Sequence, residues 1–124
     1  MTTSGCEAAI SNEMKQDYHH KDLAQGRWFA FSFFGQMANI GSEVERAMKW
    51  REKRKEYSRL ASDRAIELLD LTTSDSKNKK RLKELFRLRE VLADYFYFDN
   101  IYKSSDISWH NYFNAFNYAA AINR

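Results

Sequence analysis

The amino-acid sequence predicts an all-α protein that folds as an up-down-up-down four-helix bundle. The 124-residue chain has no proline and only four glycines, so long helices can form without interruption. Apolar residues recur at steps of three and four along most of the chain, which is the period of a helix with one buried face. The polar breaks between these stretches are short, so consecutive helices should run antiparallel to one another.

The first long helix is predicted at residues 32–54, and the other helices have to cover it. Its apolar stripe consists of Phe33, Met37, Ile40, Val44, Ala47, Met48 and Trp50. Ser32 is the candidate N-cap, because its hydroxyl oxygen can accept a hydrogen bond from a free N–H of the first turn. At 1.5 Å per residue such a helix is roughly 33 Å long, so the stripe requires companion helices of similar length.

Three companion helices are predicted from the same periodicity. The second runs from about residue 55 to residue 71, with the inward residues Tyr57, Leu60, Ala61, Ala65, Leu68 and Leu69. The third runs from about residue 77 to residue 98, with the inward residues Leu82, Leu85, Phe86, Leu88 or Arg89, Leu92, Tyr95 and Phe96. The fourth begins near residue 106, with the inward residues Trp109, Tyr112, Phe113, Phe116, Ala119 and Ala120. The candidate N-caps are Asp75 or Ser76 for the third helix and Ser105 or Asp106 for the fourth.

The chain has the length of one domain. Residues 1–25 are small, polar and aperiodic, which predicts a mobile tail, and residues 26–124 are predicted to form the bundle domain. A pair of helix-turn-helix repeats of tetratricopeptide type is the alternative architecture. It is less favoured, because such repeats usually need three stacked units for stability and the sequence supplies two hairpins.

The composition favours a cytoplasmic protein. The single cysteine, Cys6, excludes an intrachain disulfide. No apolar run reaches the roughly 20 residues that a membrane span requires, and the N-terminus lacks the basic-then-apolar order of a secretory signal. We therefore expect a soluble intracellular protein without a membrane partner.

No catalytic motif, metal site or cofactor site is recognisable. Carboxylate-bridged metal sites in bundles use Glu-x-x-His pairs, and no glutamate in this chain precedes a histidine at that spacing. A small all-helical class of ribonucleases uses an arginine four to six residues before a histidine, and that pair is missing as well. The sequence therefore predicts a protein that is not an enzyme and binds no metal or cofactor. An enzyme whose site assembles only in an oligomer is the alternative.

Two groups of cations are candidates for binding nucleic acid. The first group lies at the start of the predicted third helix and consists of Lys77, Lys79, Lys80, Arg81 and Lys83. The helix dipole disfavours cations there, and cations beside free N–H groups form an anion site suited to phosphates. A solvated charge run explains the same residues. The second group closes the first helix and consists of Lys49, Arg51, Lys53, Arg54 and Lys55, which the dipole alone can explain. Its candidates for binding nucleic acid are Lys49, Lys53, Arg54 and Lys55.

Aromatic residues make up 15% of the chain and are candidates for protein contacts. The predicted interface residues are Trp28, Phe29, Phe31, Trp50 and Trp109. Packing at one end of the bundle is the alternative explanation for the aromatic residues at 28–31. In an up-down bundle the two cation groups lie at opposite ends, so a homo-oligomer that gathers each group into a ring is expected.

Four stretches resemble a widespread group of small bacterial helical proteins to which no activity is attached. They are MANIGSEVERA at residues 37–47, ELLDLT at 67–72, RLREVLADYF at 87–96 and YFNAFNYAA at 112–120. In size, helical layout and basic character the chain is also similar, by fold-level analogy, to the accessory variability determinant of diversity-generating retroelements and to ribosomal-RNA intervening-sequence proteins. That analogy implies a pentameric basic bundle that binds RNA and assists a reverse transcriptase, with no chemistry of its own.

The sequence thus predicts a non-catalytic accessory protein that self-associates and binds nucleic acid through phosphate contacts. RNA is favoured over DNA, and a reverse transcriptase or another nucleic-acid enzyme is the expected partner. The alternative is a protein-protein interaction module that uses exposed aromatic residues and does not bind nucleic acid. Gel-shift with RNA and DNA at two salt concentrations separates the two hypotheses.

Overall fold

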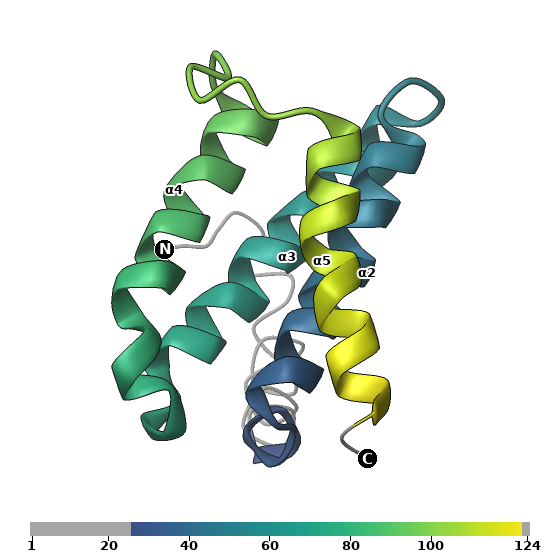
Figure 1. Ribbon diagram of the computed structural model, residues 1–124. Coiled ribbons are helices and arrows are strands. Elements are labelled where there is room, and N and C mark those ends of the chain that lie inside the picture. Colours follow the sequence, from purple (N-terminus) through teal and green to yellow (C-terminus); the bar gives the residue numbers. More distant parts are fainter. Residues whose placement is uncertain (1–25, 123–124) are drawn as a thin grey trace, which may run out of the picture. The chain divides into compact units, whose positions relative to one another are not determined.

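The computed structural model describes residues 26–122 (Figure 1). Its contacts divide the chain into two units, residues 1–30 and residues 31–124. In the first unit, residues 26–30 are helical, and the tail predicted at residues 1–25 lies outside the described residues. In the second unit the described chain is helical without a strand, so the predicted all-α class is confirmed.

Helix α2 (Phe33–Trp50) contains the predicted apolar stripe. Ser32 caps it as expected, since its Oγ accepts a hydrogen bond from the Gly35 N–H at 3.1 Å. The buried residues of this stripe are Phe33, Met37, Ile40, Val44 and Ala47. The helix ends at Trp50, four residues before the predicted end, because the chain turns at residues 51–54 and starts a new helix.

Helix α3 (Lys55–Ser74) buries a different face at its start from the one that the sequence predicts. Tyr57 and Leu60 are 44% and 66% exposed, so their predicted inward positions are wrong. Ser58 and Ser62 take the buried positions instead, and the Ser58 hydroxyl donates to the carbonyl of Ala47 at 2.7 Å. Small side chains at this face allow the two helix backbones to approach closely, and the satisfied hydroxyl makes burial of serine tolerable. Later in the helix, Ala61, Ala65, Leu68 and Leu69 are buried as predicted.

The predicted third helix consists of two segments. A 3₁₀ segment, η2 (Ser76–Arg81), precedes helix α4 (Leu82–Tyr97), and Asn78 within it has non-helical dihedral angles. Leu85, Leu88 and Leu92 are buried as predicted. Phe86 is 56% exposed, which corrects its predicted inward position, because the main backbone neighbour of α4 is α3 and the opposite face remains open.

Helix α5 (Asp106–Ile122) begins with a reciprocal cap. The Ser105 N–H donates to Ser108 Oγ, and the Ser108 N–H donates to Ser105 Oγ. Trp109 and Phe113 are buried, and Tyr112 and Phe116 are half-buried beside them. The sequence thus placed the inward face of this helix correctly.

Helix α2 is the central element of residues 31–122. It packs against both α3 and α5, and α3 also packs against α4. Helices α4 and α5 meet through side chains such as Tyr95 and Trp109, whose ring centroids are 6.3 Å apart. Figure 1 shows the α2–α3 and α4–α5 connections at one end and the α3–α4 connection at the other. None of the described helices combines the length and the apolar character needed to cross a lipid bilayer.

Candidate nucleic-acid interface

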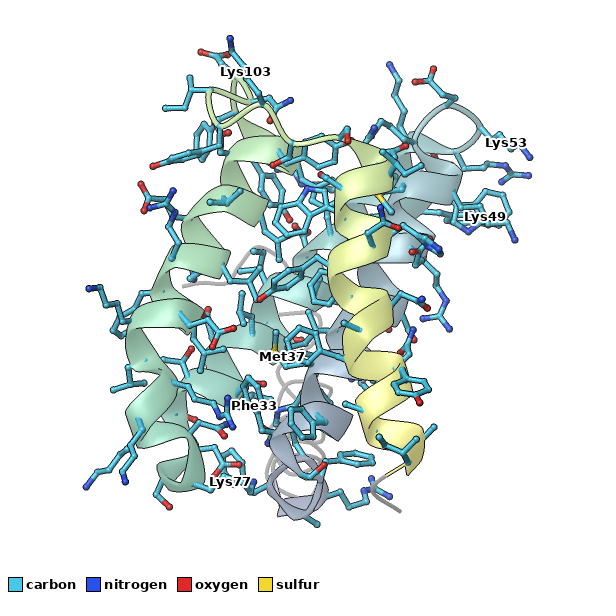
Figure 2. All side chains as sticks on the ribbon, viewed as in Figure 1. Phe33, Met37, Lys49, Lys53, Lys77 and Lys103 are labelled. Atoms are coloured by element: carbon cyan, nitrogen blue, oxygen red, sulfur yellow. The ribbon has the colours of Figure 1, made fainter. Side chains whose placement is uncertain are left out.

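The two cation groups lie at opposite ends of the second unit. Figure 2 shows Lys49 and Lys53 beside the α2–α3 connection and Lys77 at the other end, near the α3–α4 connection. This is the arrangement expected for helices that run alternately in opposite directions.

We call the first group, together with two aromatic neighbours, the turn cluster. It consists of Lys49, Trp50, Lys53, Arg54, Lys55 and Tyr57. The turn is held by the Trp50 carbonyl, which accepts the Lys53 and Arg54 N–H groups at 3.1 and 2.8 Å. Arg54 is extended, and its own carbonyl accepts the N–H of Tyr57 at 3.1 Å. The backbone thus fixes where α2 stops and where α3 starts.

Two aromatic rings pack against each other within the turn cluster. The ring centroids of Trp50 and Tyr57 are 5.6 Å apart, and the rings are nearly perpendicular at 87°. Lys49 Nζ lies 5.5 Å from the Trp50 ring centroid, and Arg54 Cζ lies 5.2 Å from the Tyr57 ring centroid. Both cations are within the range of a cation–π interaction. The sequence predicted Trp50 as an interface residue but placed Tyr57 in the core, because it did not show that Tyr57 folds back onto Trp50.

The turn cluster carries an excess of positive charge. Residues 49–57 contain five cations and two acids. Arg51, which is outside the cluster, forms an ion pair with Asp106, whereas the four cations of the turn cluster form no ion pair among the residues that the structure describes. Lys49, Lys53, Arg54 and Lys55 are exposed. Their charges are therefore accessible to an anion in solution.

We call the second group the η2 cluster, with the members Lys77, Lys79, Lys80, Arg81 and Lys83. Two of the five are engaged within the chain. The Lys77 ammonium pairs with the carboxylate of Asp75, and Arg81 Cζ lies 4.0 Å from the ring centroid of Phe33. Lys79, Lys80 and Lys83 are exposed and form no ion pair within the described part of the chain.

The helix dipole acts on the η2 cluster less strongly than the sequence indicated. Four of its cations lie in the 3₁₀ segment ahead of α4, whose first turn contains Glu84. The segment itself is capped by Asp75, whose Oδ1 accepts a hydrogen bond from the Lys77 N–H at 3.1 Å. An acidic group therefore lies at the start of η2 and another at the start of α4, where each complements the positive end of a helix dipole.

Asp75 belongs to a buried polar network that joins the η2 segment to α2. Gln36 Nε2 donates to Asp75 Oδ2 at 2.8 Å, and Asn78 Nδ2 donates to Gln36 Oε1 at 2.9 Å. Burial by itself raises the pKa of Asp75, but the hydrogen bonds from Lys77 and Gln36 outweigh it and lower this pKa from its ordinary value. Lys77 therefore has a structural role in the folded chain.

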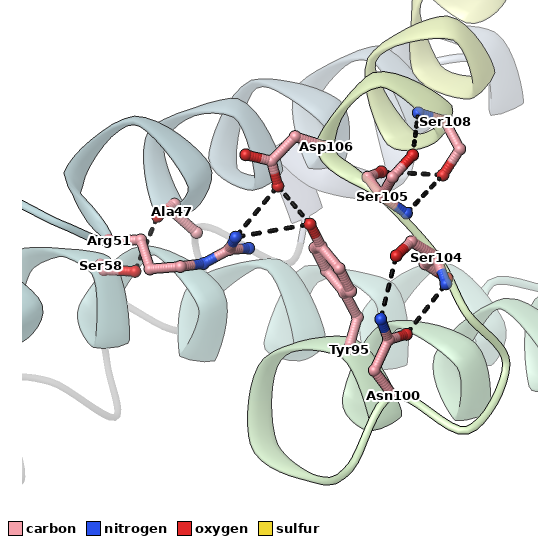
Figure 3. A network of polar contacts seen from close by, with 9 residues as sticks. All are labelled: Ala47, Arg51, Ser58, Tyr95, Asn100, Ser104, Ser105, Asp106 and Ser108. Atoms are coloured by element: carbon pink, nitrogen blue, oxygen red, sulfur yellow. Dashed lines mark hydrogen bonds and ion pairs between the residues drawn. The ribbon is translucent and has the colours of Figure 1, made fainter.

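A second polar network joins the end of α2 to α4 and α5 (Figure 3). The guanidinium of Arg51 donates from Nη1 to Asp106 Oδ1 at 3.1 Å, and the Tyr95 hydroxyl donates to the same oxygen. Arg51 Cζ also lies 4.8 Å from the Tyr95 ring centroid. Burial and the hydrogen bond to Asp106 both raise the pKa of Tyr95, although Arg51 opposes them. Arg51 therefore links the end of α2 to α4 and α5.

The predicted interface residues differ widely in exposure. Trp109 is 6% exposed and packs against Tyr95 and Phe113 in the core. Trp28 is also 6% exposed, whereas Phe29 and Phe31 are 37% and 44% exposed.

Apolar side chains that the sequence did not select lie on the open face of α4 and in the loop after it. Phe86, Phe98 and Ile101 are 56%, 73% and 71% exposed. They line a groove of about 530 Å³ together with Arg89, Glu90, Ala93, Asp94, Asp99 and Tyr102. We call this the α4 groove. Its shape depends on Asp94, whose carboxylate accepts the N–H groups of Ile101 and Tyr102 at 3.0 and 3.1 Å.

The remaining polar contacts at the surface are between helices or within them. His110 Nδ1 of α5 lies 2.6 Å from Glu45 Oε2 of α2. Glu43 pairs with Arg46 and Glu67 pairs with Arg64, as their spacing predicts. Among residues 26–122, no three His, Cys, Asp or Glu side chains converge in a way that could hold a metal ion.

In comparisons with known proteins, no family model, no curated protein and no solved structure matches this chain.

Proposed function

We propose that this protein is a non-catalytic helical bundle, with up-down-up-down topology, that self-associates and binds nucleic acid through phosphate contacts. RNA is the favoured ligand, and the partner is a reverse transcriptase or another nucleic-acid enzyme that the bundle assists. The observation that carries the proposal is the turn cluster, which has four exposed cations, two of which, Lys49 and Arg54, lie beside its two aromatic rings. The proposal assigns no reaction and no cofactor to the protein.

Phosphate binding follows from the chemistry of the two clusters. Exposed lysine and arginine side chains that are not neutralised by acids attract a polyanion, and each phosphate that they neutralise releases a condensed counterion. The turn cluster provides Lys49, Lys53, Arg54 and Lys55, and the η2 cluster adds Lys79, Lys80 and Lys83. The clusters lie at opposite ends, so one copy offers a single cluster at each end. An oligomer that brings several copies of the same cluster together would bind one nucleic acid more tightly than a single copy does.

The binding test uses fluorescence anisotropy with labelled random-sequence RNA and DNA of 20 nucleotides at 50 and 200 mM KCl. We expect wild-type affinity for RNA to fall on the order of 50-fold between these concentrations, as four phosphate contacts to a single strand would give. The double variant Lys53→Gln/Lys55→Gln and the triple variant Lys79→Gln/Lys80→Gln/Lys83→Gln should each reduce the magnitude of the salt slope for single-stranded RNA by about 0.7 per lysine that contacts a phosphate.

A matched control removes the same charge elsewhere. Arg64 and Arg87 lie on the middle of α3 and on α4, outside both clusters. The double variant Arg64→Gln/Arg87→Gln should bind RNA with nearly the wild-type salt slope. Absence of binding to either probe at 50 mM KCl, or equal slopes in all four proteins, contradicts the proposal.

Self-association is proposed to use the α4 groove as a two-fold interface. Phe86, Phe98 and Ile101 form an exposed apolar centre, and the groove is edged by charges of both signs, including Arg89 and Glu90. Two copies related by a two-fold axis would pair this centre with itself and place cations of one copy near acids of the other. The mixed charges favour a second copy of this chain over a strongly charged partner.

The oligomer is tested by light scattering during gel filtration. Wild type should elute as an oligomer, and Phe98→Asp should shift it toward the monomer. Ile107 on α5 is a matched control, since it is 70% exposed, similar to Phe98, and lies outside the groove. Ile107→Asp should leave the mass unchanged. A wild type that remains monomeric at about 100 µM contradicts the interface.

A second candidate function is a protein-protein interaction module without nucleic-acid binding. The exposed apolar residues of the α4 groove favour it, because surfaces of this kind often mark protein contacts. In that case the folded protein binds neither RNA nor DNA in the anisotropy measurement, while Phe98→Asp still disrupts binding to the protein partner.

A further inference from the structure

The aromatic pair of the turn cluster is placed unlike the aromatic residues of the core. Phe33, Trp109 and Phe113 are 2% to 6% exposed, whereas Tyr57 is 44% exposed and Trp50 is half-buried. Because the Trp50 and Tyr57 rings meet edge to face at 87°, they cannot cover each other's faces completely. The turn that holds them therefore presents aromatic surface to solvent.

Cations flank both rings at short range. Lys49 Nζ and Arg54 Cζ lie 5.5 and 5.2 Å from the centroids of Trp50 and Tyr57. A nucleotide whose base contacts one of these rings would have its phosphate near these ammonium and guanidinium groups. Arginine itself also stacks on bases, so a cation that leaves a ring can remain in contact with the ligand.

Aromatic rings flanked by cations fit unpaired bases better than paired ones. In a duplex the base faces are stacked on one another, so a protein reaches only the backbone and the groove edges. A single strand offers both its phosphates and its base faces, and proteins that bind single strands combine a cationic surface with aromatic platforms. The η2 cluster presents less ring surface, because Arg81 lies 4.0 Å from the ring centroid of Phe33, which is only 6% exposed, and 6.0 Å from that of Phe34, which is half-buried.

We infer that the turn cluster binds single-stranded nucleic acid by stacking unpaired bases on Trp50 and Tyr57, while Lys49, Lys53 and Arg54 contact the adjacent phosphates. The inference depends on the proposed nucleic-acid binding and specifies its substrate class. Stacking of one base on an aromatic residue changes affinity by about 5- to 150-fold, so it is measurable against the phosphate contribution.

The experiment compares probes on the full-length wild-type protein at one salt concentration. The probes are a 12-nucleotide DNA strand, the same strand with abasic sites at its central positions, and the blunt duplex of the same sequence. We expect the intact strand to bind at least 5-fold more tightly than the abasic strand, which keeps the phosphates but has no base to stack. The duplex should bind more weakly than the intact strand as well. A 12-nucleotide RNA strand is measured in parallel to show whether the preference holds for both kinds of nucleic acid.

A pair of variants assigns the effect to the ring. Tyr57→Leu should reduce affinity for the intact strand by about 5-fold or more and leave affinity for the abasic strand unchanged. Tyr118 on α5 is 69% exposed and lies outside the turn cluster, so Tyr118→Leu is the matched control and should bind both strands like wild type. Circular dichroism checks that both variants fold.

The outcomes separate the inference from the proposed function. If wild type binds the intact strand, the abasic strand and the duplex with equal affinity, stacking is overturned and phosphate binding stands. If none of the probes binds at 50 mM KCl, the proposed function fails and the inference fails with it. The wild-type comparison decides the result even if Tyr57→Leu does not fold.

Discussion

Gly41 gives the sharpest test of how α2 and α5 pack. A Cβ built on Gly41 lies 2.7 Å from Phe113 Cβ and 2.9 Å from Phe113 Cγ. Both residues are buried, and Phe113 is only 2% exposed. Carbon atoms prefer separations of about 3.5–4.0 Å, so Gly41→Ala forces the two helices apart by most of an ångström. The clashing atoms are close to the backbone of α5, so a rotamer change alone cannot relieve the contact.

The magnitude follows from two opposing effects. Overpacking of a core costs about 1–3 kcal/mol, and this clash belongs at the upper end, whereas alanine gains about 1 kcal/mol over glycine within a helix. We expect Gly41→Ala to lower the free energy of unfolding by about 2 kcal/mol. At roughly 4–8 °C per kcal/mol for a domain of this size, the Tm should fall by roughly 8–16 °C.

Gly35 provides the matched control in the same helix. A Cβ on Gly35 lies 3.5 Å from its nearest neighbours, Phe31 and Ser32, which is ordinary van der Waals contact. Gly35→Ala should therefore gain helix propensity and raise stability by about 0.5–1 kcal/mol. Urea and thermal unfolding followed by circular dichroism measure both variants. Equal effects of the two substitutions, or a stabilised Gly41→Ala, would refute the close approach of α2 and α5.

Two further predictions concern pH. The pKa of Asp75 is lower in the folded chain than its ordinary value of 3.8, so its stabilising effect is present above that value and is lost as pH falls through the folded pKa. Asp75→Asn should lower the free energy of unfolding at pH 7 by about 1–3 kcal/mol. This difference from wild type should shrink on acidification, and a difference that does not depend on pH refutes the prediction. Burial and Glu84 raise the pKa of Tyr112 from 10.0 to about 12. Wild-type stability should therefore fall as pH rises from 10 to 12, because Tyr112 ionises first in the unfolded chain. Tyr112→Phe should reduce this fall, which urea titrations at pH 9, 10.5 and 12 measure. Identical dependence of stability on pH in both proteins counts against the prediction.

The sequence predicts the helices well where apolar residues alone determine burial. The stripe from Phe33 to Ala47 and the pair Trp109 and Phe113 are buried as expected, because a helix with one covered face repeats with a fixed period. Tyr57, Leu60 and Phe86 share this period but are exposed. Periodicity shows which residues share a face, but it does not show how much of that face a neighbouring helix covers.

The candidate site is less predictable, because it depends on contacts between distant residues. The run of cations at 77–83 is visible in the sequence, but the ion pair of Lys77 with Asp75 and the position of Arg81 over Phe33 are tertiary features. Trp50 and Tyr57 are seven residues apart, and only the turn between α2 and α3 brings their rings together. The buried Gln36 carried no signal in the sequence, and neither did the hydrogen bonds of Asp94, since the partners of both residues come from the chain turns that follow α3 and α4.

The salt dependence of binding to a labelled single-stranded RNA tests the central claim most directly. Affinity is measured by fluorescence anisotropy from 50 to 300 mM KCl, and the slope of log K against log salt counts the phosphates that the protein neutralises. Our account predicts a slope of about −2 or steeper for wild type, which corresponds to three or more phosphate contacts, and a shallower slope for Lys53→Gln/Lys55→Gln. A slope near zero, or the same slope in both proteins, would contradict it.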